Sequence, residues 1–346
     1  MDILYLPLEF NRWFSAKKLA YSIGVGLVEG FTPNGIDHLT VPIMYHDQLW
    51  GGHLKDLVGD RKFDQVWIEV VHSVIPEHIL EWLASLAPVR FGIVIESLTM
   101  ATEEFDDNPV GTQRRIDNLN QKLPYLTHAL VYDTRDLNTL DIPTMQGVAY
   151  ISEGLVKPPS STSDKAIFYG TDYGERGEWL KRLEDRLSVN PPSVEDTSDL
   201  PHMFEQLFNS THYVPSEYDY FYSTWYSIRQ ALYSIWINHL YHIPGCAMVN
   251  LPHRTQVLSG RVIENMAAGK PVVSPYMYND ADNLFVNEKE ILYYKDIEGL
   301  IKWLDELEKN ADLRWSLAEA ARFNILEKHT TERRVKQILT FINNSN

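Results

Sequence analysis

The sequence predicts an α/β protein with two parallel-sheet domains, each sheet covered by helices on both faces. The chain has 346 residues, more than one hydrophobic core usually serves, since cores stop growing near ~250–300 residues. Short apolar runs rich in β-branched residues alternate with longer amphipathic stretches, a pattern typical of βαβ units. The stretch Val156–Ser163 interrupts this alternation with two prolines and four hydroxyl residues, as in exposed linkers. The two domains are therefore expected at residues 1–156 and 157–330.

In the first domain, near-continuous apolar runs indicate strands of a parallel sheet that is buried on both faces. The expected strands are Ile3–Leu6, Thr40–Met44, Gln65–Val70, Arg90–Ile95, Ala129–Tyr132 and Val148–Ile151. The expected helices are Ala16–Gly30, His53–Leu57, Pro76–Leu86 and Thr112–Lys122. Open α/β sheets bind ligands beyond the carboxyl ends of their strands, so the cleft between two such Rossmann-like domains is the expected site.

The alternation restarts after the linker. The expected strands are Ala166–Tyr169, His212–Val214, Ala247–Asn250, Pro271–Ser274 and Ile291–Tyr293. The expected helices are Arg176–Leu187, Pro201–Phe208, Tyr220–Tyr241, Gly260–Ala268, Ile297–Lys309 and Asp312–His329. Aromatic residues recur at helical spacing in Tyr220–Tyr241, and such a stripe is more typical of a core than of a sugar-stacking surface. A last helix, Thr331–Ile342 within residues 331–346, has one apolar face.

Composition and charge disfavour several classes of protein, among them disordered and nucleic-acid-binding proteins. With 44% hydrophobic and 23% charged residues the chain is globular rather than disordered. Its 31 basic and 47 acidic side chains give a net charge of −16, which disfavours nucleic acid as a partner. Cys246 is the single cysteine, which excludes an intrachain disulfide and favours a reducing, cytoplasmic setting. Neither a signal-peptide pattern nor a spanning apolar segment is visible, while peripheral contact with a membrane stays open.

The segment Ser259–Ser274 carries the strongest functional signal. Ser259 and Gly260 begin a helix whose first N–H groups, together with the helix dipole, form an anion site suited to a diphosphate. Glu264, one turn later, places a carboxylate where it can accept hydrogen bonds from two ribose hydroxyls. The alternative interpretation of the same residues is an exposed helix start with a solvated acid.

At these residues the chain resembles glycosyltransferases of the GT-B fold, group 1 class, and in particular the spore-maturation-type (CgeB-like) subgroup. The resemblance rests on Arg261–Val273, on Asn287–Tyr294 with the closing helices, and on Ile167–Arg176. It implies a transferase that moves a sugar from a nucleotide diphosphate sugar to an acceptor hydroxyl in the cleft between the domains. It also implies that the final helix crosses back to the first domain. The first half of the chain shows no family motif.

The same resemblance assigns the donor-binding residues. Glu264 is expected to hold the ribose, and Ser259, Gly260 and Arg261 the diphosphate. Gly170 and Arg176 are expected at the first loop of the donor domain, where a guanidinium can grip phosphate oxygens. Tyr213 is expected near the nucleobase. For Arg176, the alternative is the polar first turn of a helix.

An inverting transfer also needs a base on the first domain to deprotonate the acceptor. The candidates follow the expected strands and are Glu9, Glu69, His72, Glu96 and Asp133. His72 and Glu96 rank first as catalytic residues, His72 because its pKa range suits neutral pH. Many group 1 enzymes have a glutamate where this chain has Gln256. Whether the transfer inverts or retains configuration is therefore open.

No metal and no cofactor besides the donor substrate is expected. Asp280-Ala-Asp282 matches a metal-binding Asp-x-Asp pattern, but the neighbouring Asn279 and Asn283 favour a turn. No phosphate-loop or dinucleotide fingerprint follows a strand. The acceptor stays open among a glycan, a lipid-linked sugar, a peptide and a small molecule. Two alternative functions also remain, a nucleotide-sugar epimerase and a catalytically silent nucleotide-sugar-binding module.

Overall fold

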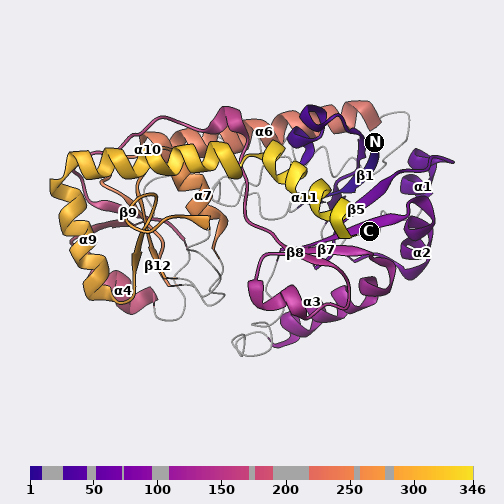
Figure 1. The fold of residues 1–346 in the computed structure, drawn as a ribbon, viewed down its shortest axis with the longest axis horizontal. Coiled ribbons are helices and arrows are strands. Elements are labelled where there is room, and N and C mark those ends of the chain that lie inside the picture. The colour runs from indigo at the N-terminus through magenta and orange to yellow at the C-terminus, as the bar shows by residue number, and fades with distance from the viewer. Residues whose placement is uncertain are drawn as a thin grey trace.

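The computed structural model has two parallel-sheet α/β domains that lie side by side along the long axis of the molecule (Figure 1). It describes residues 1–9, 26–44, 52–71, 74–95, 109–170, 176–189, 218–252, 258–276 and 284–345. Within this part of the chain, the elements alternate between strand and helix as the hydrophobic pattern predicts.

The described strands of the first sheet run in the order β3-β1-β5-β6-β7-β8, all parallel. Their bounds are β1 Asp2–Leu6, β3 Asp37–Thr40, β5 Gln65–Glu69, β6 Val89–Val94, β7 His128–Val131 and β8 Thr144–Gln146. A short pair, β2 Leu8–Glu9 and β4 Ile43–Met44, lies apart from this sheet. The helices around it are α1 Gly52–Val58, α2 Glu77–Leu86 and α3 Pro109–Lys122, with 3₁₀ turns η3 Val28–Gly30 and η4 Thr32–Asn34.

Three expectations for this domain are wrong in detail. The expected strand Thr40–Met44 divides into the end of β3 and the separate β4, with Pro42, which lacks an N–H to donate, between them. The expected strand Val148–Ile151 is replaced by β8, because Ile151 pairs through its backbone with the start of the last helix instead. Of the expected helix Ala16–Gly30, the described end is a 3₁₀ turn.

The second sheet has the order β10-β9-β11-β12-β13, again parallel. Its strands are β9 Ala166–Phe168, β10 Leu187–Val189, β11 Met248–Val249, β12 Val272–Pro275 and β13 Leu292–Tyr294. Its helices are α4 Arg176–Arg182, α7 Gly260–Ala267, α9 Ile297–Lys309 and α10 Ala311–Lys328. The expected helix to Leu187 is wrong at its end, because Leu187–Val189 extends beside β9 as an edge strand. The expected elements Pro201–Phe208 and His212–Val214 lie outside the described residues.

Helix α6, Tyr218–His242, spans both domains, whereas the sequence pattern assigns it to the second. At its start, the Tyr218 hydroxyl donates to the Thr40 carbonyl at 2.6 Å, beside the first sheet. Near its end, Trp236 packs edge-on against Tyr169, which follows β9 of the second sheet. With 25 residues and a rise of ~1.5 Å per residue, the helix is long enough to connect the two, as Figure 1 shows.

The last helix, α11 Thr331–Ser345, crosses back to the first domain as expected. The Asn34 side chain donates to the Glu332 carbonyl at 3.1 Å, and Phe341 packs edge-on against His128 of β7. At Gly30 a Cβ would lie 2.6 Å from the Thr331 carbonyl oxygen, so glycine is what allows this close approach. One buried cluster therefore runs from the first sheet through α6 and α11 to the second. No helix in the described ranges is long and apolar enough to cross a bilayer.

Candidate functional site

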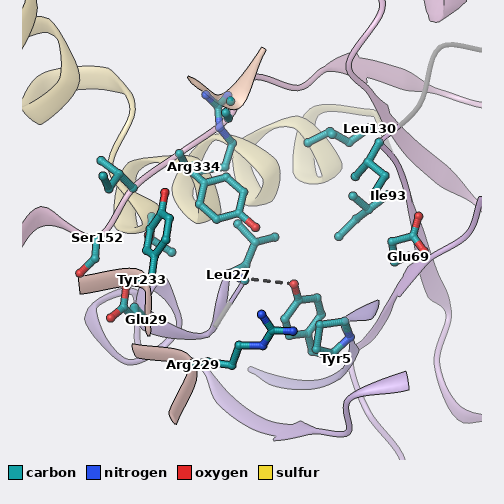
Figure 2. Close-up of a pocket in the computed structure, with 18 of the residues that line it drawn as sticks. Tyr5, Leu27, Glu29, Glu69, Ile93, Leu130, Ser152, Arg229, Tyr233 and Arg334 are labelled. Carbon is teal, nitrogen blue, oxygen red and sulfur yellow. Dashed lines mark hydrogen bonds between the residues drawn. The ribbon is translucent and has the colours of Figure 1, made fainter. Parts of the chain in front are cut away.

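A cavity lies between the two sheets, beyond the carboxyl ends of β1, β5, β6 and β7 (Figure 2). The first domain contributes mainly strand ends and the residues that follow them, among them Tyr5, Glu69, Ile93, Leu130, Tyr132 and Tyr150. The second domain contributes Gly260 and Glu264. Helices α6 and α11 complete the wall with Trp225, Arg229, Tyr233, Arg334 and Ile338. The cavity thus lies where open α/β sheets bind ligands.

Glu264 lines the cavity from the second domain, where the sequence predicts the donor site. It lies one turn into α7, where its Oε2 accepts hydrogen bonds from the Tyr169 hydroxyl and the Trp236 indole N–H, each at 3.3 Å. Burial raises the pKa of Glu264 to about 7, and both hydrogen bonds and the nearby Arg261 oppose that rise. A carboxylate held in this way, on the cavity wall, is placed to accept hydrogen bonds from a ligand.

Gly170 and Arg261 meet beside this carboxylate. The Arg261 guanidinium donates to the Tyr169 carbonyl at 2.7 Å and lies 5.8 Å from the centre of the Tyr169 ring. Gly170 has φ +146°, and a Cβ there would collide with the Arg261 guanidinium. Glycine is favoured at position 170 for two reasons: other residues rarely adopt this backbone conformation, and the Arg261 guanidinium lies too close for a side chain. The structure brings Gly170, Arg261 and Glu264 together.

The start of α7 is where the sequence predicts an anion site. Ser259 has an extended backbone, φ −67° and ψ 150°, and precedes the first helical residue, Gly260. The buried Ser259 hydroxyl has no hydrogen-bond partner among the described residues. The hydroxyl and the first N–H groups of the helix are thus placed to donate to a phosphate oxygen.

Arg176 is the first residue of α4, so the alternative of a first helical turn describes its position, but its side chain is buried. Its Nε donates to the Pro252 carbonyl at 2.9 Å, and its guanidinium lies 5.8 Å from the centre of the Phe168 ring. This position is at the carboxyl end of β9, as expected, but Arg176 does not line the interdomain cavity. Its contact with phosphate stays a prediction.

Among the candidate bases, Glu69 is the one that the described structure places on the cavity wall. Its Oε1 accepts from the Val71 N–H at 3.2 Å. The buried ammonium of Lys122 lies nearby and donates to the Val70 carbonyl at 2.9 Å. Burial lowers the pKa of Lys122 to about 8, and the negative charge of Glu69 opposes this effect.

The remaining candidates differ in position. Asp133 is buried, accepts from the Arg135 backbone at the start of a 3₁₀ turn and pairs with the Arg135 guanidinium at 2.5 Å, so its carboxylate is already used. The predicted catalytic residues His72 and Glu96 lie outside the described residues, as do Tyr213, Gln256, Asp280 and Asp282. The side chain of Glu9 also lies outside them. Their roles stay predictions.

Sequence reasoning missed the polar groups that complete the cavity. Four tyrosines line it, Tyr5 and Tyr233 buried and Tyr132 and Tyr150 half-buried, and desolvation raises the pKa of each hydroxyl. Two of them occupy strand ends, a position that could have been read from the sequence. Trp225 and Tyr233 belong to the aromatic stripe of α6, which is largely buried as expected but also faces the cavity.

Two charged groups of the cavity come from segments without a motif. Glu29 follows a stretch outside the described residues, accepts a hydrogen bond from Gln230 and has a pKa raised by burial, which a bond with Ser152 opposes. Arg229 lies within α6, and Figure 2 shows its side chain reaching toward Tyr5. In the described part of the chain, no group of three His, Cys, Asp or Glu side chains is placed to hold a metal.

The chain is also similar to known proteins. A family model described as glycosyl transferase-like matches residues 228–340, which include α7 and the closing helices. No curated protein sequence matches the chain.

Among solved structures, Anabaena Alr3699/HepE in complex with UDP is similar, with TM-score 0.52 and 11% identity over 99% of this chain and 100% of that one. WaaG, a glycosyltransferase involved in lipopolysaccharide biosynthesis, has TM-score 0.51 and 13% identity over 97% and 98%. A variant of S. aureus TarM in complex with UDP has TM-score 0.51 and 14% identity over 85% of this chain, which spans only 58% of the TarM chain. The chain therefore has the GT-B fold, with two parallel-sheet α/β domains and a cavity between them.

Proposed function

We propose that the protein is a glycosyltransferase, which moves a sugar from a nucleotide diphosphate sugar to an acceptor hydroxyl without a divalent metal. One observation supports this most. Gly260 and Glu264, on the donor side, face Glu69 and the tyrosines of the first domain across a single cavity. The glycosyl transferase-like match covers the donor-side residues, and two proteins of similar fold have been crystallised with UDP.

In the proposed donor site, Glu264 accepts hydrogen bonds from the ribose hydroxyls. The start of α7, with Ser259 and the backbone N–H groups, donates to the diphosphate, and Arg261 adds positive charge nearby. These fixed donors stabilise the charge that builds up on the leaving diphosphate, which is the role a metal ion plays in other enzymes.

In the proposed reaction, the Glu69 carboxylate takes the proton of the acceptor hydroxyl. The acceptor oxygen then bonds to the anomeric carbon of the sugar, while the bond from that carbon to the diphosphate oxygen breaks. The nucleoside diphosphate leaves with the bonding electron pair. A single displacement of this kind inverts the configuration of the sugar. His72 and Glu96 remain the other candidates for the base.

The cavity encloses about 180 Å³, less than the ~300–1,000 Å³ of pockets that hold a drug-sized ligand. In this conformation it suits the sugar and the acceptor hydroxyl rather than a whole nucleotide sugar. We infer that the nucleotide lies beside α7, at the edge of the cavity. As a finer proposal, the enzyme is a hexosyltransferase of the spore-maturation-type subgroup, acting in the cytoplasm.

The test is to incubate the protein with a panel of nucleotide sugars in EDTA and to follow nucleoside diphosphate and free sugar. Slow hydrolysis of one donor, with release of nucleoside diphosphate, is the expected result. An isomerised nucleotide sugar would instead indicate an epimerase. Binding without any turnover, even with acceptor mixtures, would indicate a binding module. Activity that EDTA removes and Mg²⁺ or Mn²⁺ restores would contradict the metal-independent mechanism.

A further inference from the structure

The guanidinium of Arg334 is buried without a carboxylate partner. Arg334 is 4% exposed and lies in the first turns of α11. Its Nη1 donates to the Gln337 side-chain oxygen at 2.7 Å, and its Nη2 lies 3.4 Å from Nδ1 of His329. Its Nε has no hydrogen-bond partner among the residues that the structure describes. The guanidinium therefore makes two contacts, although it has five N–H donors.

Both partners of Arg334 are neutral. Gln337 is an amide, and the pKa of His329 is lowered to about 3, mainly by burial and further by the Arg334 and Lys328 charges. In the described part of the chain, no acidic side chain forms an ion pair with Arg334. This is notable in a chain with 47 acidic residues. Burial lowers the pKa of Arg334 itself, because nothing nearby compensates its charge fully.

An uncompensated buried cation is costly. Removing a charged group from water costs several kcal/mol unless an opposite charge and further hydrogen bonds replace the lost hydration. A bound anion would supply both, through the free Nε–H and the remaining N–H donors. Arg–oxoanion contacts of this kind are among the strongest hydrogen bonds in proteins, and the planar fork suits phosphate and carboxylate alike.

The position of Arg334 indicates which ligand such an anion belongs to. Arg334 lies on the wall of the interdomain cavity (Figure 2). The cavity hydroxyls that influence its pKa are those of Tyr132 and Tyr150, which belong to the first domain. The donor-side residues Gly260 and Glu264 belong to the second domain. An anion at Arg334 is therefore on the acceptor side.

The other charges of the cavity are consistent with an anionic ligand. Arg229 adds a second guanidinium to the wall. Burial raises the pKa of Glu29, and it raises that of Glu264 to about 7, so the Glu264 carboxyl carries less negative charge near neutral pH than an exposed one does. Glu69 lies beside the Lys122 ammonium. The acids of the cavity therefore do not prevent an anion from binding at Arg334.

We propose that Arg334 binds an anionic group of the acceptor, a phosphate or a carboxylate attached close to the hydroxyl that receives the sugar. This inference rests on the proposed function, because it assigns the acceptor side of the same cavity. It makes the acceptor an acidic sugar or polyol derivative rather than a neutral one, although the protein surface as a whole is negative.

The experiment compares three probes that share one ring: glucose, glucose 6-phosphate and glucuronate. Calorimetric titration measures the affinity of each for the wild-type protein and for Arg334→Gln, Arg334→Lys and Arg333→Gln. Arg333 is the matched control, since it neighbours Arg334 on the same helix, is exposed, and loses the same charge on substitution. Circular dichroism and thermal unfolding establish that each variant is folded, and a nucleoside diphosphate titration of the same samples reports the donor site.

We expect the wild type and Arg333→Gln to bind at least one charged probe about tenfold more tightly than glucose. In Arg334→Gln this preference should fall to about twofold or less, and Arg334→Lys should keep part of it. A preference for glucose 6-phosphate would indicate that the anionic group is a phosphate, and a preference for glucuronate would indicate a carboxylate. The nucleoside diphosphate affinity should stay the same in all four proteins.

Equal or absent binding of charged and neutral probes by the wild type would overturn the inference, and so would an unchanged preference in Arg334→Gln. A loss of nucleoside diphosphate affinity in Arg334→Gln would also overturn it, because Arg334 would then serve the donor. Failure of the wild type to bind any nucleoside diphosphate would contradict the proposed function instead. The comparison of charged and neutral probes on the wild-type protein tests the inference even if Arg334→Gln does not fold.

Discussion

At the scale of single residues, the proposed donor site depends on Glu264. Its carboxylate is held by Tyr169 and Trp236 at the edge of the cavity, and burial raises its pKa to about 7. It is therefore largely protonated at pH 6 and largely ionised at pH 8. Only the ionised form can accept two charge-assisted hydrogen bonds from ribose hydroxyls.

We predict that nucleoside diphosphate affinity rises between pH 6 and pH 8 in the wild type and that Glu264→Gln loses this rise. At pH 8 the substitution should cost about 1–3 kcal/mol of binding free energy, a factor of roughly 5–150 in affinity. Comparison of the two proteins by titration cancels the ionisation of the ligand itself. Glu327→Gln, an exposed change on α10, is the control. Parallel pH curves for wild type and Glu264→Gln would remove Glu264 from the donor site.

Substitution of Glu69 should affect a different quantity, because its proposed role is to act on the acceptor rather than on the donor. Removal of a general base typically slows a reaction by a factor of 10²–10⁴. We predict a loss of this size in donor hydrolysis for Glu69→Gln, with unchanged nucleoside diphosphate affinity. Glu81→Gln, an exposed change on α2, should leave both quantities unchanged. Full activity of Glu69→Gln would mean that Glu69 is not the general base and would leave His72 and Glu96 as the candidates.

At the scale of elements, local sequence predicted best those segments whose own residues decide their conformation. The closing helices are examples, since Asp296 and Asn310 cap α9 and α10 by accepting from Gly299 and Leu313 N–H groups. The expected strand at Val148–Ile151 is wrong because Ile151 pairs with Thr330, 179 positions away in the chain. No local pattern reports such a partner.

The same limit applies to the candidate site. Ser259–Glu264 could be recognised because its residues are consecutive and its geometry is that of one helix start. Arg229 and Arg334 could not, because each is an arginine within an ordinary amphipathic helix. Their position on the cavity depends on how α6 and α11 pack between the domains. Sequence reasoning thus singled out the cavity residues of α7 and missed most of those on the other walls.

The contact between α11 and the first domain can be tested at Gly30. A Cβ there would lie 2.6 Å from both the Thr331 carbonyl oxygen and Val335 Cγ2, so Gly30→Ala must push α11 away. We predict a loss of about 1–3 kcal/mol in unfolding free energy, measured by urea titration. Gly154→Ala is the control, since a Cβ at Gly154 meets nothing within 4 Å. Equal stability of the two variants would show that α11 is not tightly packed on η3.

At the scale of the whole molecule, α6 and α11 join two domains that could otherwise unfold separately. Their buried side chains, such as Ile237 and Val335, belong to the same cluster as Ile3 of the first sheet and Ile167 of the second. Domains linked by a small polar interface tend to move and unfold independently, whereas a large apolar interface couples them. The continuous cluster therefore predicts one cooperative unit.

We predict that the two sheets unfold in a single transition. In hydrogen exchange at increasing urea, amides of β5 and β12 should lose protection at the same midpoint, because opening either sheet exposes the shared cluster. Ile237→Ala in α6, where the side chain is fully buried, should lower both midpoints together, since such a change typically costs 2–5 kcal/mol. Tyr220→Ala on the same helix is the control, because Tyr220 is 72% exposed. Separate midpoints for β5 and β12 would mean that the cavity lies between two independently stable domains, and ligand binding would then have to bring its two walls together.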